Sequence, residues 1–190
     1  MIELEREFTY LLNKLPDDLD EFPSKIIEDI YVPAEARHPI IRIRRNGEKM
    51  MITKKYPIDS PEDIIGDASR QVEHTIDLSP DEYKSLASLP GKQFKKRRFA
   101  YKFNGQDAEI DVYLDKLAGL AVVDFEFNSD EAMEKFVKPD FVGTDVTQDE
   151  MVAGGMLCGK SYDDLVNQLE QKYGYKPLTG TEKYEEEYGV

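Results

Sequence analysis

The chain has little cysteine, no long apolar run and no excess of positive charge, and each absence excludes a class of protein. Cys158 is the only cysteine, so neither a disulfide within the chain nor a cysteine-based zinc site can form. No stretch approaches the roughly 18 consecutive apolar residues of a transmembrane helix. The charged residues 1–8 lack the apolar region of a signal peptide. We therefore expect a soluble, cytoplasmic protein without a membrane partner.

The charge of the chain is strongly acidic but unevenly distributed. The formal net charge is −14, which argues against nucleic acid as a partner, because phosphate backbones attract basic surfaces. Thirteen of the 25 lysines and arginines nevertheless lie in two short windows, 37–55 and 92–102. An acidic chain with two concentrated basic segments indicates a local site for a small anion.

Alternation with a period of two residues dominates the sequence and predicts strands. The alternating segments are 2–10, 40–45, 51–55, 68–78, 94–103, 108–114 and 120–128. Asn-Gly pairs at 46–47 and 104–105 predict tight turns. Helices are fewer: the patterns predict one from Ser79 to about Leu89, a short one over 129–136, and one from Ser161 through Lys172.

The polar faces of these strands carry charges of a recurring kind, whereas the opposite faces are mostly apolar. If the apolar faces pack outward under helices, the charged faces line the inside of a barrel, and a barrel of about eight strands can hold one small ligand. Residues 1–176 are expected to form this single domain. Residues 177–190, which are acidic and rich in tyrosine, are expected to be a loosely held tail.

Four pairs of charged residues at i and i+2 carry the chemistry, because such pairs point to the same side of a strand. Paired carboxylates can share a hard cation, and paired guanidinium or ammonium groups match phosphate oxygens. Each pair has a simpler reading as a solvated strand face. The acidic pair at 124 and 126 follows a strongly apolar run, where unpaired carboxylates would be costly to bury. The pairs are Glu3 with Glu5, Arg42 with Arg44, Lys96 with Arg98, and Asp124 with Glu126.

Taken in order, the motifs resemble those of the CYTH superfamily, the triphosphate tunnel metalloenzymes. In chain order they are Glu3-Leu-Glu5-Arg-Glu7, Arg42-Ile-Arg44 with Thr53 and Lys55, Glu73, Lys96-Arg-Arg98, Glu109-Ile-Asp111, Asp124-Phe-Glu126 and Asp145-Val-Thr147. Each motif is weak alone, but their order and spacing match from residue 1 to about residue 160.

The resemblance implies a fold that is mainly β with flanking helices, a closed eight-stranded antiparallel barrel that forms a tunnel. It also implies a metal-dependent hydrolase of a small triphosphate, inorganic or nucleoside, in which positioning and charge neutralisation do most of the work. Glu3, Glu5, Asp124 and Glu126 would hold Mg²⁺ or Mn²⁺. The expected substrate-binding residues are Arg42, Arg44, Lys55, Glu73, Lys96 and Arg98, with Lys55 and Lys96 also catalytic.

One departure from the resemblance reverses a charge. Glu7 stands where the N-terminal signature has lysine, and by strand parity it faces the same way as Glu3 and Glu5. We expect it either to pair with an interior base such as Arg44 or Lys96, or to act as an additional metal ligand. A class IV adenylate cyclase and a non-catalytic triphosphate or nucleotide binder remain open alternatives. The sequence does not indicate an oligomeric state.

Overall fold

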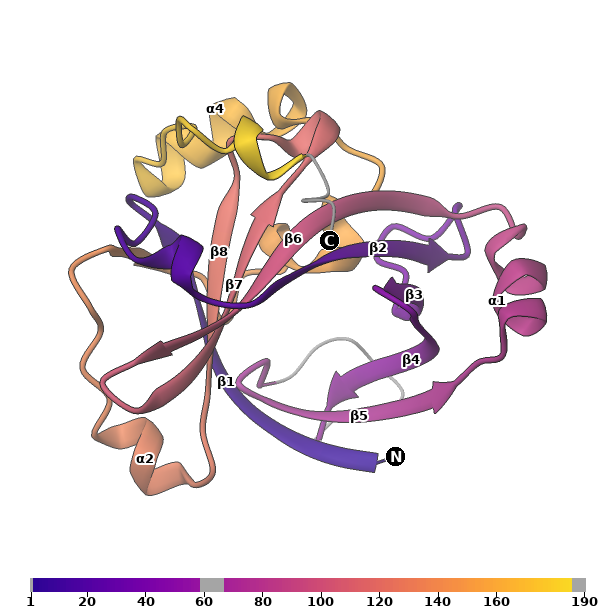
Figure 1. Cartoon of the computed structure of the whole chain (residues 1–190), viewed down its shortest axis with the longest axis horizontal. Coiled ribbons are helices and arrows are strands. Elements are labelled where there is room, and N and C mark those ends of the chain that lie inside the picture. The colour runs from indigo at the N-terminus through magenta and orange to yellow at the C-terminus, as the bar shows by residue number, and fades with distance from the viewer. Residues whose placement is uncertain (1, 59–66, 186–190) are drawn as a thin grey trace.

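The computed structural model describes residues 2–58 and 67–185, with side chains from residue 5 onward (Figure 1). The strands are β1 (Ile2–Leu12), β2 (Ser24–Val32), β3 (Ile41–Asn46), β4 (Lys49–Pro57), β5 (Arg70–Asp77), β6 (Lys92–Phe103), β7 (Gln106–Tyr113), β8 (Ala121–Glu126) and β9 (Val142–Asp145). The helices are α1 (Pro80–Ala87), α2 (Asp130–Glu134), α3 (Gly154–Leu157) and α4 (Tyr162–Tyr173).

The strands form one antiparallel sheet that closes on itself. Their order is β5-β4-β3-β2-β6-β7-β8-β1-β9, and β5 also pairs with β1. Strand β1 closes the barrel by changing partner along its length: residues 2–6 pair with β5 and residues 7–11 with β8. Strand β9 is an additional strand on β1. The predicted closed eight-stranded antiparallel barrel with flanking helices is thereby confirmed.

The register decides which side chains face the interior. Arg44 lies opposite Asp29, Lys55 opposite Glu73, and Arg98 opposite Asp111. Because directly opposed residues on neighbouring strands project to the same face, the charged positions of successive strands share the inner side of the barrel.

Strand β2 is missing from the segments that the sequence pattern predicts. Its inner positions include Ile27 and Tyr31, and its outer positions include Ile26 and Ile30. Apolar residues therefore occur on both faces of β2, which weakens the alternation of charged and apolar residues that marks the other strands.

The helices that the sequence predicts are present and begin with side-chain caps. Ser79 and Glu82 form a capping box at the start of α1, and Ser161 and Asp164 form one at the start of α4. Ser129 caps the short α2. None of the helices in the described ranges combines the length and apolar content that crossing a membrane requires.

The larger apolar core lies outside the barrel wall. The outward side chains of β1, β6, β7 and β8 pack there against α2 and the segment that leads to β9, and they include Tyr10, Phe99, Ile110, Val123 and Phe125. The outer face of β3 to β5 is less well covered, contrary to the expectation that helices shield every apolar face. The side chain of Ile76 on β5 is 64% exposed.

One end of the barrel interior is filled by apolar side chains. Tyr31, Phe94, Tyr113 and Val122 lie on the inner face by the register, and all are buried. They pack in one cluster with Val146, Met151, Val152, Leu157 and Cys158, which follow β9. The polar part of the interior therefore reaches solvent at the opposite end, where Lys25 and Glu126 are exposed.

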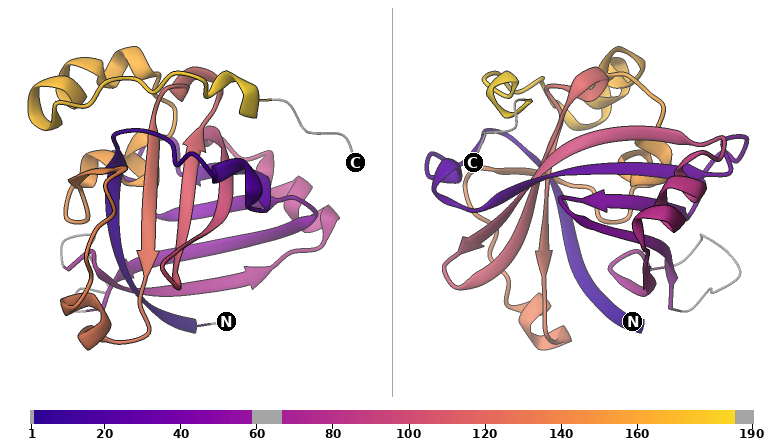
Figure 2. Two further views of the ribbon diagram at one scale, coloured as in Figure 1. Left: turned by 60° about the vertical axis from the view of Figure 1, so that its left-hand side comes forward. Right: turned by 45° about the vertical axis from the view of Figure 1, so that its right-hand side comes forward.

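The described part of the C-terminal tail is packed against the barrel rather than loosely held. Tyr184 is 2% exposed, its ring packs edge-on against Phe99 at 5.0 Å between centroids, and Arg97 Nε donates a hydrogen bond to its carbonyl oxygen. Figure 2 shows the orange and yellow C-terminal segments together beside the turn that joins β7 to β8. The boundary between domain and tail at residue 177 stays a prediction.

Candidate triphosphate site

A buried arginine and a buried aspartate anchor one side of the interior. Arg44 donates from Nε and Nη2 to the two carboxylate oxygens of Asp29, at 2.7 Å each, and Asp29 is fully buried. Burial alone would raise the pKa of Asp29, but the Arg44 guanidinium holds it at about 2. The pair fixes Arg44 and does not involve its Nη1 donors. Asp29 is therefore a site residue that the sequence pattern did not predict.

Arg42 is the other inward-facing arginine of β3, two residues before Arg44. Its Nη2 donates to Glu73 Oε2 at 3.4 Å, and Thr75 Oγ1 donates to the other oxygen of Glu73 at 2.6 Å. Burial would raise the pKa of Glu73, but Arg42 and the Thr75 hydroxyl lower it. Glu73 is thus an ionised carboxylate that positions an arginine, and it would repel a phosphate if it contacted one directly.

Lys96 and Arg98 share a single carboxylate, that of Asp111. Lys96 Nζ lies 2.5 Å from Asp111 Oδ2, and Arg98 donates from Nε and Nη2 to both oxygens at 2.7 and 2.6 Å. Arg98 Nη1 also donates to Glu109. Burial would raise the pKa of Asp111, but Arg98 and Lys96 hold it well below its ordinary value.

The two lysines assigned catalytic roles from the resemblance lie in different electrostatic surroundings. Burial and the neighbouring Arg98 lower the pKa of Lys96 to about 8. Burial would also lower the pKa of Lys55, but the carboxylates of Glu7 and Glu5 raise it well above its ordinary value. Lys96 can therefore lose its proton near pH 8, whereas Lys55 stays charged.

Glu7 does face the interior, and it pairs with Lys55 rather than with Arg44 or Lys96. Lys55 Nζ lies 2.5 Å from Glu7 Oε1 and 2.5 Å from Glu5 Oε2. Burial, with the negative charges of Asp124 and Glu5, raises the pKa of Glu7 to about 7, although Lys55 opposes this shift. The charge reversal at this position is met by a lysine from β4.

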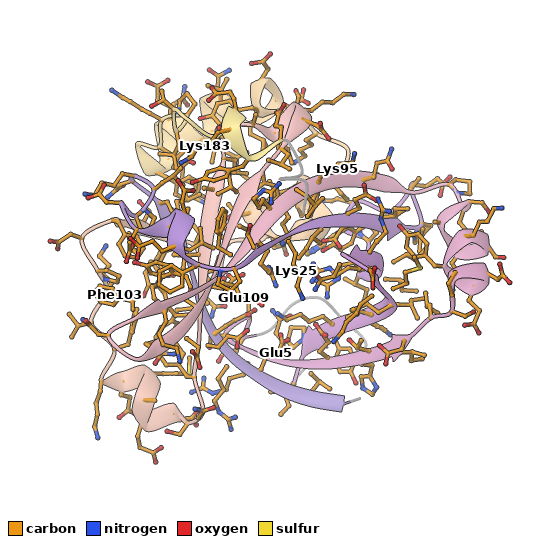
Figure 3. The ribbon with its side chains drawn as sticks, in the orientation of Figure 1. Glu5, Lys25, Lys95, Phe103, Glu109 and Lys183 are labelled. Carbon is orange, nitrogen blue, oxygen red and sulfur yellow. The ribbon has the colours of Figure 1, made fainter. Side chains whose placement is uncertain are left out.

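A group of carboxylates lies at the open end of the interior. Partial desolvation at the mouth of the barrel and the neighbouring Glu109 and Glu5 raise the pKa of Glu126 to about 7. Burial and Asp111 raise the pKa of Asp124, which accepts a 2.6 Å hydrogen bond from Thr9 Oγ1. Figure 3 shows Glu5 and Glu109 on the inner side of the barrel.

The interior holds more acid than base. With Lys25 at the open end, six bases lie among eight carboxylates, and full ionisation would leave a net charge of about −2, which the raised pKa values of Glu7, Asp124 and Glu126 partly relieve. A polyanion can enter such a space only with additional positive charge. The carboxylates are Glu5, Glu7, Asp29, Glu73, Glu109, Asp111, Asp124 and Glu126.

The donor set fits a divalent cation in its chemistry. Mg²⁺ and Mn²⁺ prefer carboxylate oxygens, and Glu5, Asp124 and Glu126 supply them with an excess of negative charge. Among the side chains that the structure describes, no group of three or more carboxylates, histidines or cysteines is gathered closely enough to hold an ion as it stands. The side chain of Glu3, which lies opposite Glu73 in the register, is outside the described residues.

Comparison with known proteins points to the same fold. No family model matches the chain. An inorganic triphosphatase of Nitrosomonas europaea is 29% identical over 152 residues, covering 79% of this chain and 92% of that protein. The solved structure of the inorganic triphosphatase NE1496 is similar at a TM-score of 0.59 and 22% identity, covering 82% of this chain and 95% of that one. With the ordered motifs and the charged interior already described, these likenesses show that the chain has the CYTH-like tunnel fold.

Proposed function

We propose that this protein is a metal-dependent hydrolase of a small triphosphate, inorganic or nucleoside, bound inside the barrel. The observation that carries the proposal is the convergence of five bases from β3, β4 and β6 on one interior, where each base forms an ion pair with a carboxylate of another strand. The bases are Arg42, Arg44, Lys55, Lys96 and Arg98. The likeness to inorganic triphosphatases supports the same substrate class.

The ion pairs suggest how the ligands would enter. A triphosphate that takes hydrogen bonds from Lys55 and Arg98 competes with Glu5 and Glu109, and it frees those carboxylates for a cation. Triphosphate and metal should therefore bind together more tightly than either binds alone. The cation, held by Glu5, Asp124, Glu126 and Glu3, would neutralise charge on the phosphate oxygens.

The protein groups divide the remaining work. Arg42, Arg44 and Arg98 hold the phosphate chain with planar guanidinium groups that match its oxygens. Lys55, which stays charged, neutralises phosphate. Lys96 is the group placed to accept a proton from water, because its pKa is lowered to about 8.

The Glu7–Lys55 pair favours a second candidate, a triphosphate binder without turnover. Glu7 makes the site more negative by two units of charge than lysine at that position would. It also forms an ion pair with Lys55, which would otherwise be free to contact phosphate.

Phosphate release from a panel of inorganic, nucleoside and thiamine triphosphates separates the candidates, when measured with and without Mg²⁺ or Mn²⁺. The proposal predicts release from at least one of them that stops when EDTA removes the metal. Tight binding without release would favour the binder, and cyclic AMP with pyrophosphate as the products of ATP would favour a cyclase.

A further inference from the structure

Strand β2 contributes an interior base that lies outside the motifs of the resemblance. Lys25 is paired in the register with Arg98 on β6, and Arg98 is paired with Asp111 on β7. Opposed residues share a face, so Lys25 projects to the inner side on which Arg98 meets Asp111. Figure 3 shows Lys25 on this side together with Glu5 and Glu109, whereas Lys95 lies on the outer side of β6.

The surroundings of Lys25 differ from those of the five bases in the ion-pair network. Each of the five has a carboxylate partner within 4 Å. Lys25 is exposed and forms no ion pair within the part of the chain that the structure describes. Its opposed neighbour Arg98 is also a cation, and the Asp111 and Glu109 carboxylates there are already bound to Arg98.

Two cations directly opposed on neighbouring strands repel one another, which destabilises the strand pair. An anion bound between them removes that repulsion. Lys25 also lies toward the open end of the interior, because the other end of β2 carries Tyr31, which is buried in the apolar cluster that fills the closed end. A ligand entering the polar end therefore meets Lys25 before it meets Lys96, which lies opposite the deeper Ile27.

We propose that Lys25 is a phosphate-binding residue that, with Arg98, holds the outer phosphate of a triphosphate while Lys96 faces the inner part of the chain. The assignment rests on the proposed function. The contact between Lys25 and the outer phosphate is the same in the bound substrate and in the transition state, because attack takes place at the inner end of the triphosphate. Lys25 therefore contributes to binding more than to turnover.

Lys25→Ala and Lys25→Arg test this role, with Lys95→Ala as the matched control, because Lys95 is an exposed lysine on the outer face beside β2, where it pairs with Glu28 at 3.5 Å. Calorimetry with inorganic triphosphate and Mg²⁺ gives the Kd, and phosphate release gives kcat and KM. Lys25→Ala should raise Kd and KM about tenfold, the loss expected for one exposed charge-assisted contact. Its kcat should change by less than about threefold. Lys25→Arg should restore most of the affinity, and Lys95→Ala should change neither quantity.

Equal affinity of Lys25→Ala, Lys95→Ala and the unsubstituted protein would overturn the assignment of Lys25 and leave the proposed function standing. A loss confined to kcat would also overturn it. Absence of triphosphate binding by the unsubstituted protein would instead overturn the proposed function, and the role of Lys25 with it. Because Lys25 is exposed and lies opposite a like charge, its replacement should not lower the melting temperature, which separates a lost contact from a folding defect.

Discussion

Glu7 Oε1 lies 2.5 Å from Nζ of Lys55, and this contact couples β1 to β4 across the barrel interior. The same lysine contacts Glu5, so a single ammonium group is shared by two carboxylates of one strand. Triphosphate must compete with both carboxylates for Lys55.

Replacing Glu7 should therefore strengthen triphosphate binding. Glu7→Lys changes the local charge by two units, and two unit charges about 4 Å apart interact by about 4 kcal/mol at an effective dielectric of 20. We expect at least a tenfold lower Kd for inorganic triphosphate, about a threefold decrease for Glu7→Gln, and nearly unchanged metal affinity in both, by calorimetry. Glu28→Gln, on the outer face beside Arg45, is the control. Weaker metal binding would identify Glu7 as a metal ligand. Unchanged affinity for triphosphate in both variants would show that Glu7 does not belong to the site.

Asp29 should be important for stability, because it is fully buried with a bidentate arginine partner. Asp29→Asn leaves Arg44 charged and uncompensated in the interior, which typically costs about 3–5 kcal/mol. Urea unfolding at pH 7 measures the loss, and Glu28→Gln, at a partly exposed pair, should cost less than about 1 kcal/mol. Equal stability of the two variants would contradict a buried ion pair.

The Asp29–Arg44 ion pair should also make the free energy of unfolding depend on pH. The folded-state pKa of Asp29 is about 2, below the ordinary value of about 3.9, so the pair contributes fully above about pH 4. That contribution is lost as the pH falls through about 2. The difference in unfolding free energy between the unsubstituted protein and Asp29→Asn should shrink over this window, and a constant difference would show that Asp29 is not the titrating group.

The direction in which kcat/KM changes with pH distinguishes two possible roles of Lys96. If Lys96 accepts a proton from water, kcat/KM rises as the pH increases through about 8, because the neutral amine is the active form. If it acts only as a cation, kcat/KM falls over the same range. Lys96→Arg keeps the charge but not the base, and it should reduce kcat about 100-fold or more at pH 8. A pH profile that is the same with and without the substitution would exclude proton transfer by Lys96.

The carboxylates at the open end should bind the metal. Glu126→Gln should abolish the binding of Mn²⁺ measured calorimetrically with inorganic triphosphate present, because Glu126 lies beside Glu5 and Glu109 and its pKa is raised to about 7 by partial desolvation and by them. Glu28→Gln, a carboxylate on the outer face paired with Arg45, serves as the control. Mn²⁺ binding that survives Glu126→Gln would refute the assignment of this residue.

The sequence predicts the barrel well, because strand parity is a strong constraint. Because Arg42 and Arg44 alternate with Ile41 and Ile43, a shift of one residue would move both arginines out of the polar interior and both isoleucines into it. The same argument places Lys96 and Arg98 on the inner face, and the structure brings both pairs into one interior.

The partner of each charge could not be predicted from the sequence. Arg44 meets Asp29 because of the register between β2 and β3, and Glu7 meets Lys55 because the closed sheet brings β1 opposite β4 across the interior. Tyr184 likewise has no local signal that it would bury its ring against Phe99. Alternation along one strand says which face a residue occupies but not which residue it contacts, so these contacts emerge only from the closed sheet.

The central claim, that the barrel interior binds and cleaves a triphosphate, is tested most directly by phosphorus NMR of inorganic triphosphate mixed with the protein and Mg²⁺. The account predicts that the triphosphate resonances broaden on binding and are replaced by those of orthophosphate and pyrophosphate. Arg98→Ala should strongly reduce both effects. Broadening without new resonances would support binding but contradict hydrolysis. Triphosphate resonances that neither broaden nor decay with the unsubstituted protein would contradict the whole claim.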